Sequence, residues 1–332
     1  MEFPLLDILD TIKQLGWSGA IELFRNGLTL GSLYALIALG YSMVYGILKL
    51  LNFAHGDVYM IGAFLGYGVL NLFGGPLSPN IALAPLIVLM FLGAMLGAGL
   101  LGVLIERFAY RPLRDAPRIA PLISALGVSF FLQNSVLLLF GSQFRTYNSF
   151  LLGSAHPEFF EPGPLIDSVV VIHGVKIQLV QVLVLAMSVG LMIALTLLVS
   201  RTRIGKAMRA TSFDREAAAM MGIDVDRVIA STFFIGSVLA GAAGVMFGLL
   251  FSQIFHFMGF LAGLKGFTAA VVGGIGSIPG AMLGGLLVGL AESYATGYVG
   301  GRWSDLIVFA ILIFVLLVRP SGLLGARAIH KV

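Results

Sequence analysis

The chain has 332 residues, of which 58% are hydrophobic and only 11% are charged, and its mean hydropathy is +1.01. This composition excludes a soluble domain with a fully solvated surface and makes lipid the main solvent. The net charge of +4 does not indicate nucleic-acid binding, because there is no soluble basic face with interleaved aromatic residues, and the absence of cysteine excludes thiolate catalysis and disulfides.

The first segment, residues 1–26, is unlike a signal peptide, because it carries Glu2, Asp7 and Asp10 and lacks a basic start before a clean apolar core. We expect an amphipathic helix on the membrane surface. A helix needs roughly 20 apolar residues to cross the hydrocarbon. Runs near this length lie at residues 27–48, 58–73, 81–105, 119–140, 177–199, 229–251 and 304–318.

These runs predict an all-α polytopic membrane protein with about eight embedded helical segments. They belong to a single membrane domain over residues 27–325, followed by a short tail at 326–332. Broken or re-entrant helices are expected near residues 49–57 and 263–294, where the apolar pattern is interrupted.

The first break, residues 49–57, contains Asn52, His55 and Asp57. An ionisable group at membrane depth costs on the order of 3 kcal/mol unless it faces protein or water. These residues are therefore candidates for lining or gating a translocation pathway. The alternative is that they cap helix ends at the cytoplasmic interface, and for His55 we favour this structural role. Gln133 and Asn134, in the fourth span, are further candidates, although hydrogen bonds between helices are the simpler interpretation.

Basic residues gather beside the ends of the spans. Arginines cluster within residues 107–118, and both Lys and Arg cluster within 201–227. By the positive-inside rule both loops lie in the cytoplasm, together with the C-terminal tail. The more acidic segment 141–176 then lies outside.

The basic loop at residues 201–227 has the signals of a short helix followed by a second helix start. Thr211 and Asp214 are predicted to supply N-terminal capping oxygens, Gly222 to end the short helix in the left-handed conformation, and Asp224 to start the next helix. In so apolar a chain this loop is interpreted as a docking device. The alternative is a solvated loop ordered by lipid phosphates.

The second break lies between the sixth and the last predicted spans. Counting crossings from the loop at 201–227, residues 263–294 must leave and return to the same side, as a re-entrant hairpin or as two short crossings. Gly273, Gly274, Gly276 and Pro279 interrupt this segment. Two such breaks in the two halves of a chain point to a permeation pathway, so these four residues are also pathway candidates.

Catalysis finds little support in the sequence. Residues 97–102 fit a dinucleotide-binding pattern but lie inside an apolar span, so we interpret them as a helix-packing surface. Gly205 and Lys206 lack the upstream glycine of a phosphate-binding loop, so the chain is not expected to be an ATPase. We predict no catalytic residue and no metal site.

Several stretches, taken together and in order, resemble the LivH-type permeases of bacterial branched-chain amino-acid ABC importers. The similarity runs from about residue 27 to residue 325. It rests on residues 31–41, on 52–57 with 62–63, on 106–107 with 110–114, and on 202–210, 273–281 and 319–325.

The resemblance implies a permease subunit that moves branched-chain or related amino acids across the bacterial inner membrane by alternating access. It also implies a second homologous permease, a periplasmic substrate-binding protein, and two cytoplasmic ATPase subunits that hold ATP and Mg²⁺. This chain itself would carry no cofactor, and its membrane contacts would be with lipid. Alternatives left open are a permease for urea or short amides and a self-sufficient ion-coupled carrier or channel, in which His55 and Asp57 relay protons or bind a cation.

The resemblance extends to the loop that couples importers of this kind to their ATPases. Its residues here would be Thr211, Asp214, Glu216, Ala217, Ala218 and Gly222. The chain departs from the longer importer pattern, because no Ile-x-Leu-Pro sequence follows downstream.

Overall fold

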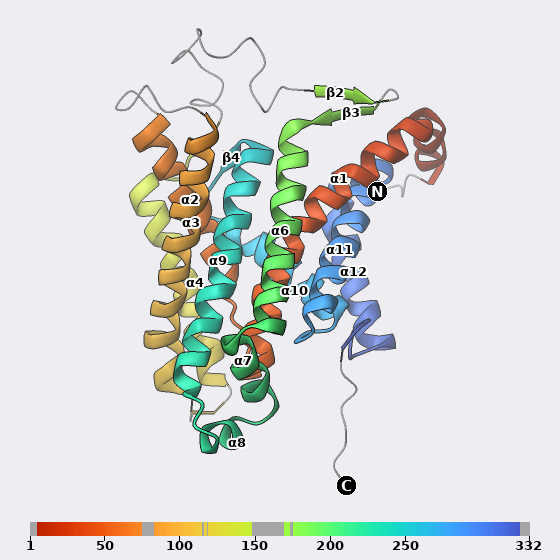
Figure 1. Ribbon diagram of the computed structural model, residues 1–332. Coiled ribbons are helices and arrows are strands. Elements are labelled where there is room, and N and C mark those ends of the chain that lie inside the picture. The colour runs from red at the N-terminus through yellow and green to blue at the C-terminus, as the bar shows by residue number, and fades with distance from the viewer. Residues whose placement is uncertain are drawn as a thin grey trace.

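The computed structural model describes residues 5–74, 83–114, 116–117, 119–147, 169–172 and 175–325. The predicted tail at 326–332 lies outside the described residues, as does most of the predicted outer segment 141–176. Within the described residues the chain is almost entirely helical, which confirms the all-α prediction (Figure 1). Eight of the described helices are long and apolar enough to cross a membrane.

The helices follow one another in this order: α1 Leu5–Leu48, α2 His55–Gly74, α3 Leu83–Ile105, η1 Glu106–Tyr110, η2 Arg111–Leu113, α4 Ile119–Phe140, α6 Leu179–Arg201, α7 Arg203–Phe213, α8 Arg215–Met220, α9 Val225–Phe251, α10 Met258–Gly273, α11 Ile278–Tyr298 and α12 Gly301–Val318. Short strands form two antiparallel pairs. β1 (Arg145–Thr146) pairs with β4 (Gln253–Ile254), and β2 (Val169–Ile172) pairs with β3 (Val175–Gln178).

α1 changes direction at Gly16, where φ is 53° and ψ is −162°. Every other residue of α1 keeps helical geometry, so an uninterrupted helix runs from Gly16 to Leu48. Residues 17–26 of the predicted surface segment therefore continue directly into the first membrane helix. The side chains of residues 1–15 lie outside the described residues.

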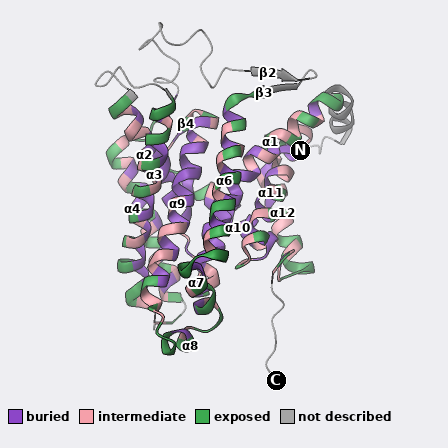
Figure 2. Cartoon of the chain, viewed as in Figure 1, coloured by how far each residue is buried: buried purple, intermediate pink, exposed green. Residues whose placement is uncertain are grey.

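The core of the bundle is formed by α1 and α9, with α2, α3, α10 and α11 packed around them (Figures 1 and 2). Small residues allow the helix backbones to touch. A methyl group on Gly289 of α11 would lie 2.2 Å from the Gly31 Cα of α1. Likewise, Gly102 of α3 faces Ser237 of α9, where a methyl group would lie 2.1 Å from Oγ. The packing interpretation of residues 97–102 is therefore confirmed.

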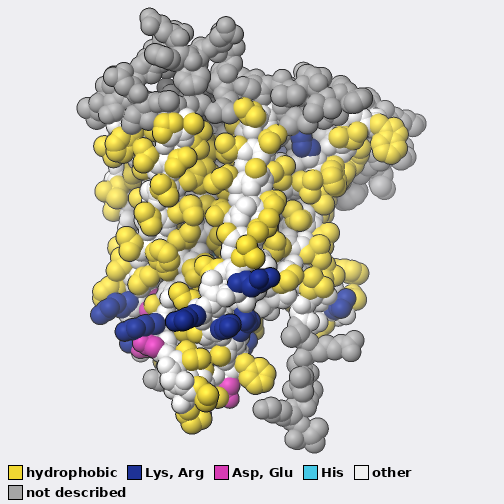
Figure 3. Space-filling model, viewed as in Figure 1, with side chains coloured by type: hydrophobic (Ala, Val, Ile, Leu, Met, Phe, Trp, Pro, Cys, Tyr) yellow, Lys and Arg dark blue, Asp and Glu magenta, His cyan; other side chains and the backbone are white. Residues whose placement is uncertain are grey.

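The peripheral helices are apolar on their exposed faces. The membrane-length stretch of α12 is 11% buried, whereas that of α1 is 83% buried. Apolar side chains cover the visible face of the bundle, and Lys and Arg gather at the end that carries α7 and α8 (Figure 3). This distribution fits a protein whose sides face lipid and whose α7 and α8 end lies in the cytoplasm.

Both predicted breaks are present. α1 ends at Leu48, and Lys49 takes a left-handed conformation with φ of 57° before α2 begins at His55. α10 and α11 are separated by a turn in which Gly274 and Gly276 have φ of 110° and 89°.

α10 and α11 form a helical hairpin whose turn lies beside the segment that follows α12. The Leu323 and Leu324 amides donate to the carbonyl oxygens of Val272 and Gly273 at 2.9 and 2.8 Å. α10 has 16 residues, about 24 Å of helix, so it is shorter than its neighbours. Residues 263–294 therefore run toward the end of the bundle that carries α7 and then return, as the counting of crossings requires.

The loop at 201–227 contains two helices, α7 and α8, whereas the sequence predicts one short helix there. The prediction that Thr211 caps a helix is wrong, because α7 continues through it to Phe213. Thr202 caps α7 instead, with its Oγ1 accepting from the Gly205 amide at 3.1 Å. The capping roles of Asp214 and Asp224 are confirmed, since they accept from the Ala217 and Arg227 amides at 3.0 and 3.1 Å.

Candidate functional site: a broken-helix centre and a cytoplasmic knuckle

The first break carries the start of α2 into the interior of the bundle. A methyl group on Gly40 of α1 would lie 2.1 Å from the His55 Nε2 atom and 3.2 Å from the Gly236 carbonyl oxygen of α9. Gly40 is about 12 Å along the helix from Leu48, at 1.5 Å per residue. α2 therefore begins well inside the bundle, between α1 and α9, and not at its cytoplasmic end.

Asp57, in the first turn of α2, is 1% exposed. Its Oδ1 atom accepts a hydrogen bond of 3.0 Å from Gln133 Nε2 of α4. The same oxygen lies against the first turn of α10, because a methyl group on Gly259 would approach it to 2.9 Å. Asp57 is thus placed at the N-terminal ends of two helices, where the backbone dipoles favour a negative charge.

Asn52 and His55 lie in the same buried region. The Asn52 Oδ1 atom accepts from the Tyr110 hydroxyl at 3.2 Å, which joins the break to η1. The Asn52 carbonyl oxygen accepts from the His55 amide at 3.0 Å. The His55 ring meets Tyr41 edge to face, with centroids 4.9 Å apart. Both side chains are buried, and the His55 Nε2 atom has no hydrogen-bond partner within the described residues.

The two pathway candidates on α4 lie in different environments. Gln133 is buried and forms the interhelical hydrogen bond to Asp57. Asn134 is exposed, and its Nδ2 atom donates to the Phe130 carbonyl of its own helix at 2.7 Å. The structure therefore brings Gln133 into the broken-helix centre and leaves Asn134 outside it.

The four candidates of the second break lie at the end of the bundle that carries α7, away from Asp57. Gly273 packs on Gly280, and Gly274 packs on Gly325. Gly276 and Pro279 line a cavity of about 280 Å³ together with Gly46, near the C-terminal end of α1. The two breaks thus occupy two levels of the bundle, and both contact α1.

We use the term cytoplasmic knuckle for residues 203–222, which comprise α7, α8 and the turn that follows. Gly222 has φ of 82°, and the Ile223 amide donates to the Ala218 carbonyl at 3.1 Å, so α8 ends in the predicted left-handed turn. Ala218 is buried, whereas Glu216 and Ala217 are exposed. These last two therefore lie on the accessible face of α8.

The tip of the knuckle exposes large apolar side chains. Phe213 is 93% exposed, and Met220 and Met221 are each 82% exposed. They belong to α7, α8 and the turn after α8, at the end of the bundle where Lys and Arg gather (Figure 3). Large apolar side chains this exposed, close together in the chain and outside the membrane-length helices, indicate an interaction site.

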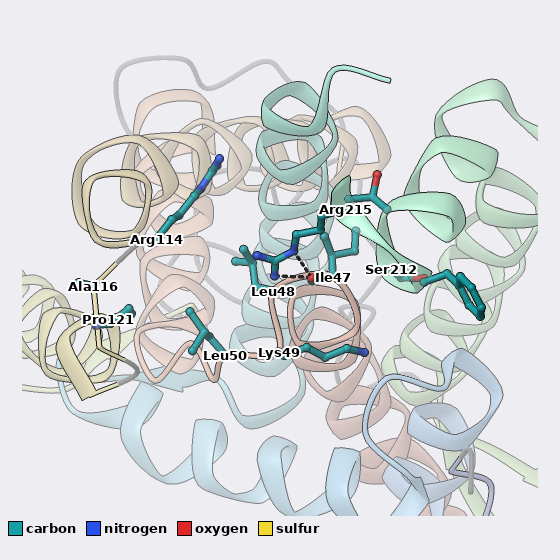
Figure 4. A pocket seen from close by; sticks show the side chains of 11 residues that line it. Ile47, Leu48, Lys49, Leu50, Arg114, Ala116, Pro121, Ser212 and Arg215 are labelled. Carbon is teal, nitrogen blue, oxygen red and sulfur yellow. Dashed lines mark hydrogen bonds between the residues drawn. The ribbon is translucent and has the colours of Figure 1, made fainter. Parts of the chain in front are cut away.

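A clamp joins the knuckle to the end of α1. The Arg215 Nε and Nη2 atoms donate to the Ile47 carbonyl oxygen at 3.0 and 2.6 Å (Figure 4). Arg215 lines a cavity of about 330 Å³ with Lys49 and Arg114. Burial, and then the neighbouring Arg215 charge, lower the pKa of Lys49. Arg215 therefore ties the start of α8 to the Ile47 carbonyl group, two residues before the first break.

An ionic cluster that was not predicted from the sequence joins α10, α11 and α12. The Lys265 Nζ atom lies 2.7 Å from Glu292 Oε1 and 2.7 Å from Asp305 Oδ1. The available signal was Lys265 itself, an ionisable residue within the apolar run of α10. No group of three or more His, Asp or Glu side chains in the described part of the chain could hold a metal ion.

Comparison with known proteins gives a consistent match. Residues 23–316 match a family described as branched-chain amino acid transport system / permease component. The chain is 44% identical to the high-affinity branched-chain amino acid transport system permease protein BraD of Pseudomonas aeruginosa, over 92% of this chain and 96% of that protein. It is also 44% identical to the corresponding LivH of Escherichia coli, with the same coverage. A probable LivH of Methanocaldococcus jannaschii is 28% identical over 95% of this chain and 94% of that protein.

Proposed function

Because the chain belongs to the family of permease components of branched-chain amino acid transport systems, we propose that it is the membrane-spanning permease subunit of an ATP-driven importer of branched-chain amino acids. The observation that carries this proposal is the 44% identity to such permeases over nearly the whole chain. Eight membrane-length helices within the described residues support a multi-pass protein of the inner membrane.

The energy source is proposed to lie on partner subunits. The sequence has no phosphate-binding loop, and the family description is that of one component of a system. We assign two cytoplasmic ATPase subunits, which hold ATP and Mg²⁺, a second homologous permease and a periplasmic substrate-binding protein. The ATPases would dock on the cytoplasmic knuckle, whose apolar tip offers a surface for a groove on a partner.

The knuckle and the broken helices suggest how hydrolysis is coupled to movement. When the ATPases close, α8 moves with them, and Arg215 carries this movement to the Ile47 carbonyl at the end of α1. The adjacent break allows α2 to change its angle without unwinding α1. ATP and the loaded binding protein each favour a different permease conformation, since a ligand shifts an equilibrium only by its differential affinity for the two states.

The test is reconstitution of the permease pair, the ATPases and the binding protein in lipid vesicles. We expect accumulation of leucine, isoleucine or valine that requires ATP and every component. Uptake of these amino acids by this chain alone, driven by an ion gradient without ATP, would instead support the ion-coupled carrier. Accumulation of urea or a short amide in place of amino acids would identify a different substrate class.

The docking role of the knuckle has its own test. Replacing Met220 and Met221 with glutamate puts two charges on the exposed apolar tip, so we expect the ATPases no longer to copurify with the permease. The matched control is replacement of Leu316 and Leu317 of α12, which are exposed on a membrane-length helix, with methionine. Retention of the ATPases by the doubly charged variant would rule out docking at this tip.

A further inference from the structure

A cavity of about 580 Å³ lies in the half of the bundle opposite the cytoplasmic knuckle. It is lined by the middle of α1, by the N-terminal parts of α6 and α10 and by the C-terminal parts of α9 and α11. These ends lie away from α7 and α8 (Figure 1). The volume is within the range of about 300–1,000 Å³ that is typical of small-molecule sites.

Opposite charges face one another in the wall of this cavity. Lys265 of α10 and Glu292 of α11 both line it and form an ion pair of 2.7 Å, with side chains 11% and 12% exposed. The Tyr34 hydroxyl donates to the second Glu292 oxygen at 2.9 Å. Lys265 also contacts Asp305, so one ammonium group is shared by two carboxylates. The cavity wall itself thus presents one ammonium group and one carboxylate side by side.

A hydrogen-bond acceptor in the same wall has no partner. The Gln181 side chain is 7% exposed, and its Nε2 atom donates to Asn26 Oδ1 at 3.0 Å. Its Oε1 atom is buried without a hydrogen bond within the described part of the chain. Leaving a buried acceptor unsatisfied costs about 1–3 kcal/mol. A ligand with N–H donors would remove this cost.

One part of the cavity wall is apolar. This part is lined by Phe247, Leu250 and Phe251 of α9 and by Leu261 and Ala262 of α10, whereas Thr29, Ser293 and Thr296 are among the polar residues that line the remainder. A branched aliphatic side chain gains about 0.8 kcal/mol for each CH₂ group that it buries against such a wall.

We propose that this cavity is a binding site for a zwitterionic aliphatic amino acid in the permease itself, and this inference rests on the proposed function. The amino-acid ammonium group would bind Glu292 and the Gln181 Oε1 atom. Its carboxylate would bind Lys265, which gives up part of its contact with Glu292 while keeping Asp305. The aliphatic side chain would lie against the α9 wall. The permease would therefore recognise both charges and the side-chain size of the amino acid that the binding protein delivers.

The first experiment measures side-chain size selection in the reconstituted importer. Ala262→Leu adds a side chain inside the cavity, so the ratio of leucine to alanine uptake should fall at least about fivefold, with the same binding protein present at saturation. The control is Ala310→Leu, the same change at an exposed position of α12, which should leave the ratio unchanged. A ratio unaffected by Ala262→Leu would overturn the proposed site.

The second experiment measures charge recognition with the purified complex and no binding protein. Radiolabelled leucine should bind saturably and be displaced by unlabelled leucine. Leucinamide, which lacks the carboxylate, and 4-methylpentanoate, which lacks the ammonium group, should displace it at least about tenfold less well. In Lys265→Gln, leucinamide should compete about as well as leucine, which a purely structural lysine would not produce.

The two proposals fail in different ways. If the wild-type complex accumulates leucine with ATP but shows neither saturable binding nor charge discrimination, the cavity site is wrong and the proposed function stands. A tightly bound lipid that leucine does not displace would also overturn the site. If the complete wild-type complex shows no ATP-driven uptake of any branched-chain amino acid, the proposed function itself is wrong.

Discussion

Gly56 lies where the starts of α2 and α10 meet, and replacing it with alanine tests the broken-helix centre. A methyl group at this position would lie 2.3 Å from the Gly259 carbonyl oxygen and 2.7 Å from the Gly263 Cα atom. Ordinary contact between such atoms needs about 3.4 Å or more. α10 would therefore have to retreat by about 1 Å from α2, and the carboxylate of Asp57 would move with its helix.

The cost of this change follows from the packing. Overpacking of a close-packed interior costs typically about 1–3 kcal/mol, and here both neighbouring atoms belong to backbone, which cannot rotate away. We expect Gly56→Ala to lower the thermal unfolding midpoint of the purified complex and to reduce ATP-driven uptake more than tenfold.

The matched control lies on the same helix. At Gly68 of α2, an added methyl group would have no atom of the described chain within 4 Å. Gly68→Ala should keep uptake and raise stability by about 0.5–1 kcal/mol, because alanine favours helix over glycine. Equal melting points and equal uptake for the two variants would refute the close approach of α2 and α10.

Two further predictions concern single contacts with controls nearby in the chain. Arg215→Gln removes the hydrogen bonds to the end of α1, so uptake per ATP hydrolysed should fall by roughly tenfold, or about 1.4 kcal/mol of coupling. The control is Arg227→Gln, at a side chain that is 87% exposed, and it should leave this ratio unchanged. A normal ratio in both variants would argue against the clamp. Gln133→Leu removes a hydrogen-bond donor from the buried Asp57 carboxylate, which should cost about 1–3 kcal/mol and lower the melting point of the complex. Asn134→Leu, at the exposed neighbouring position, should not; similar melting points for the two would contradict the role assigned to the Gln133 hydrogen bond.

The broken helices show which features could be predicted from the sequence. Residues 49–57 and 263–294 were recognised because hydrocarbon does not tolerate an unpaired backbone, so a glycine, proline or polar interruption within an apolar run is a local signal. The left-handed turn at Gly222 and the caps at Asp214 and Asp224 were predictable because they too are local signals. Each depends on residues within one helical turn.

Where local signals compete, the sequence was misleading. Thr211 has a good capping side chain, but α7 extends past it to Phe213, and this helix packs on α6 and α9. Tertiary packing decided the boundary, and the threonine became a buried helical residue.

By itself, the sequence determined that the chain spans a membrane and where its helices break, because hydropathy and turn chemistry act over short stretches of chain. Only the tertiary structure decided which distant residues meet. Arg215 reaches Ile47, Gln133 reaches Asp57, and Lys265 joins Glu292 in the wall of the outer cavity. No local pattern encodes these pairs, since each depends on how the small residues of one helix allow another helix to approach.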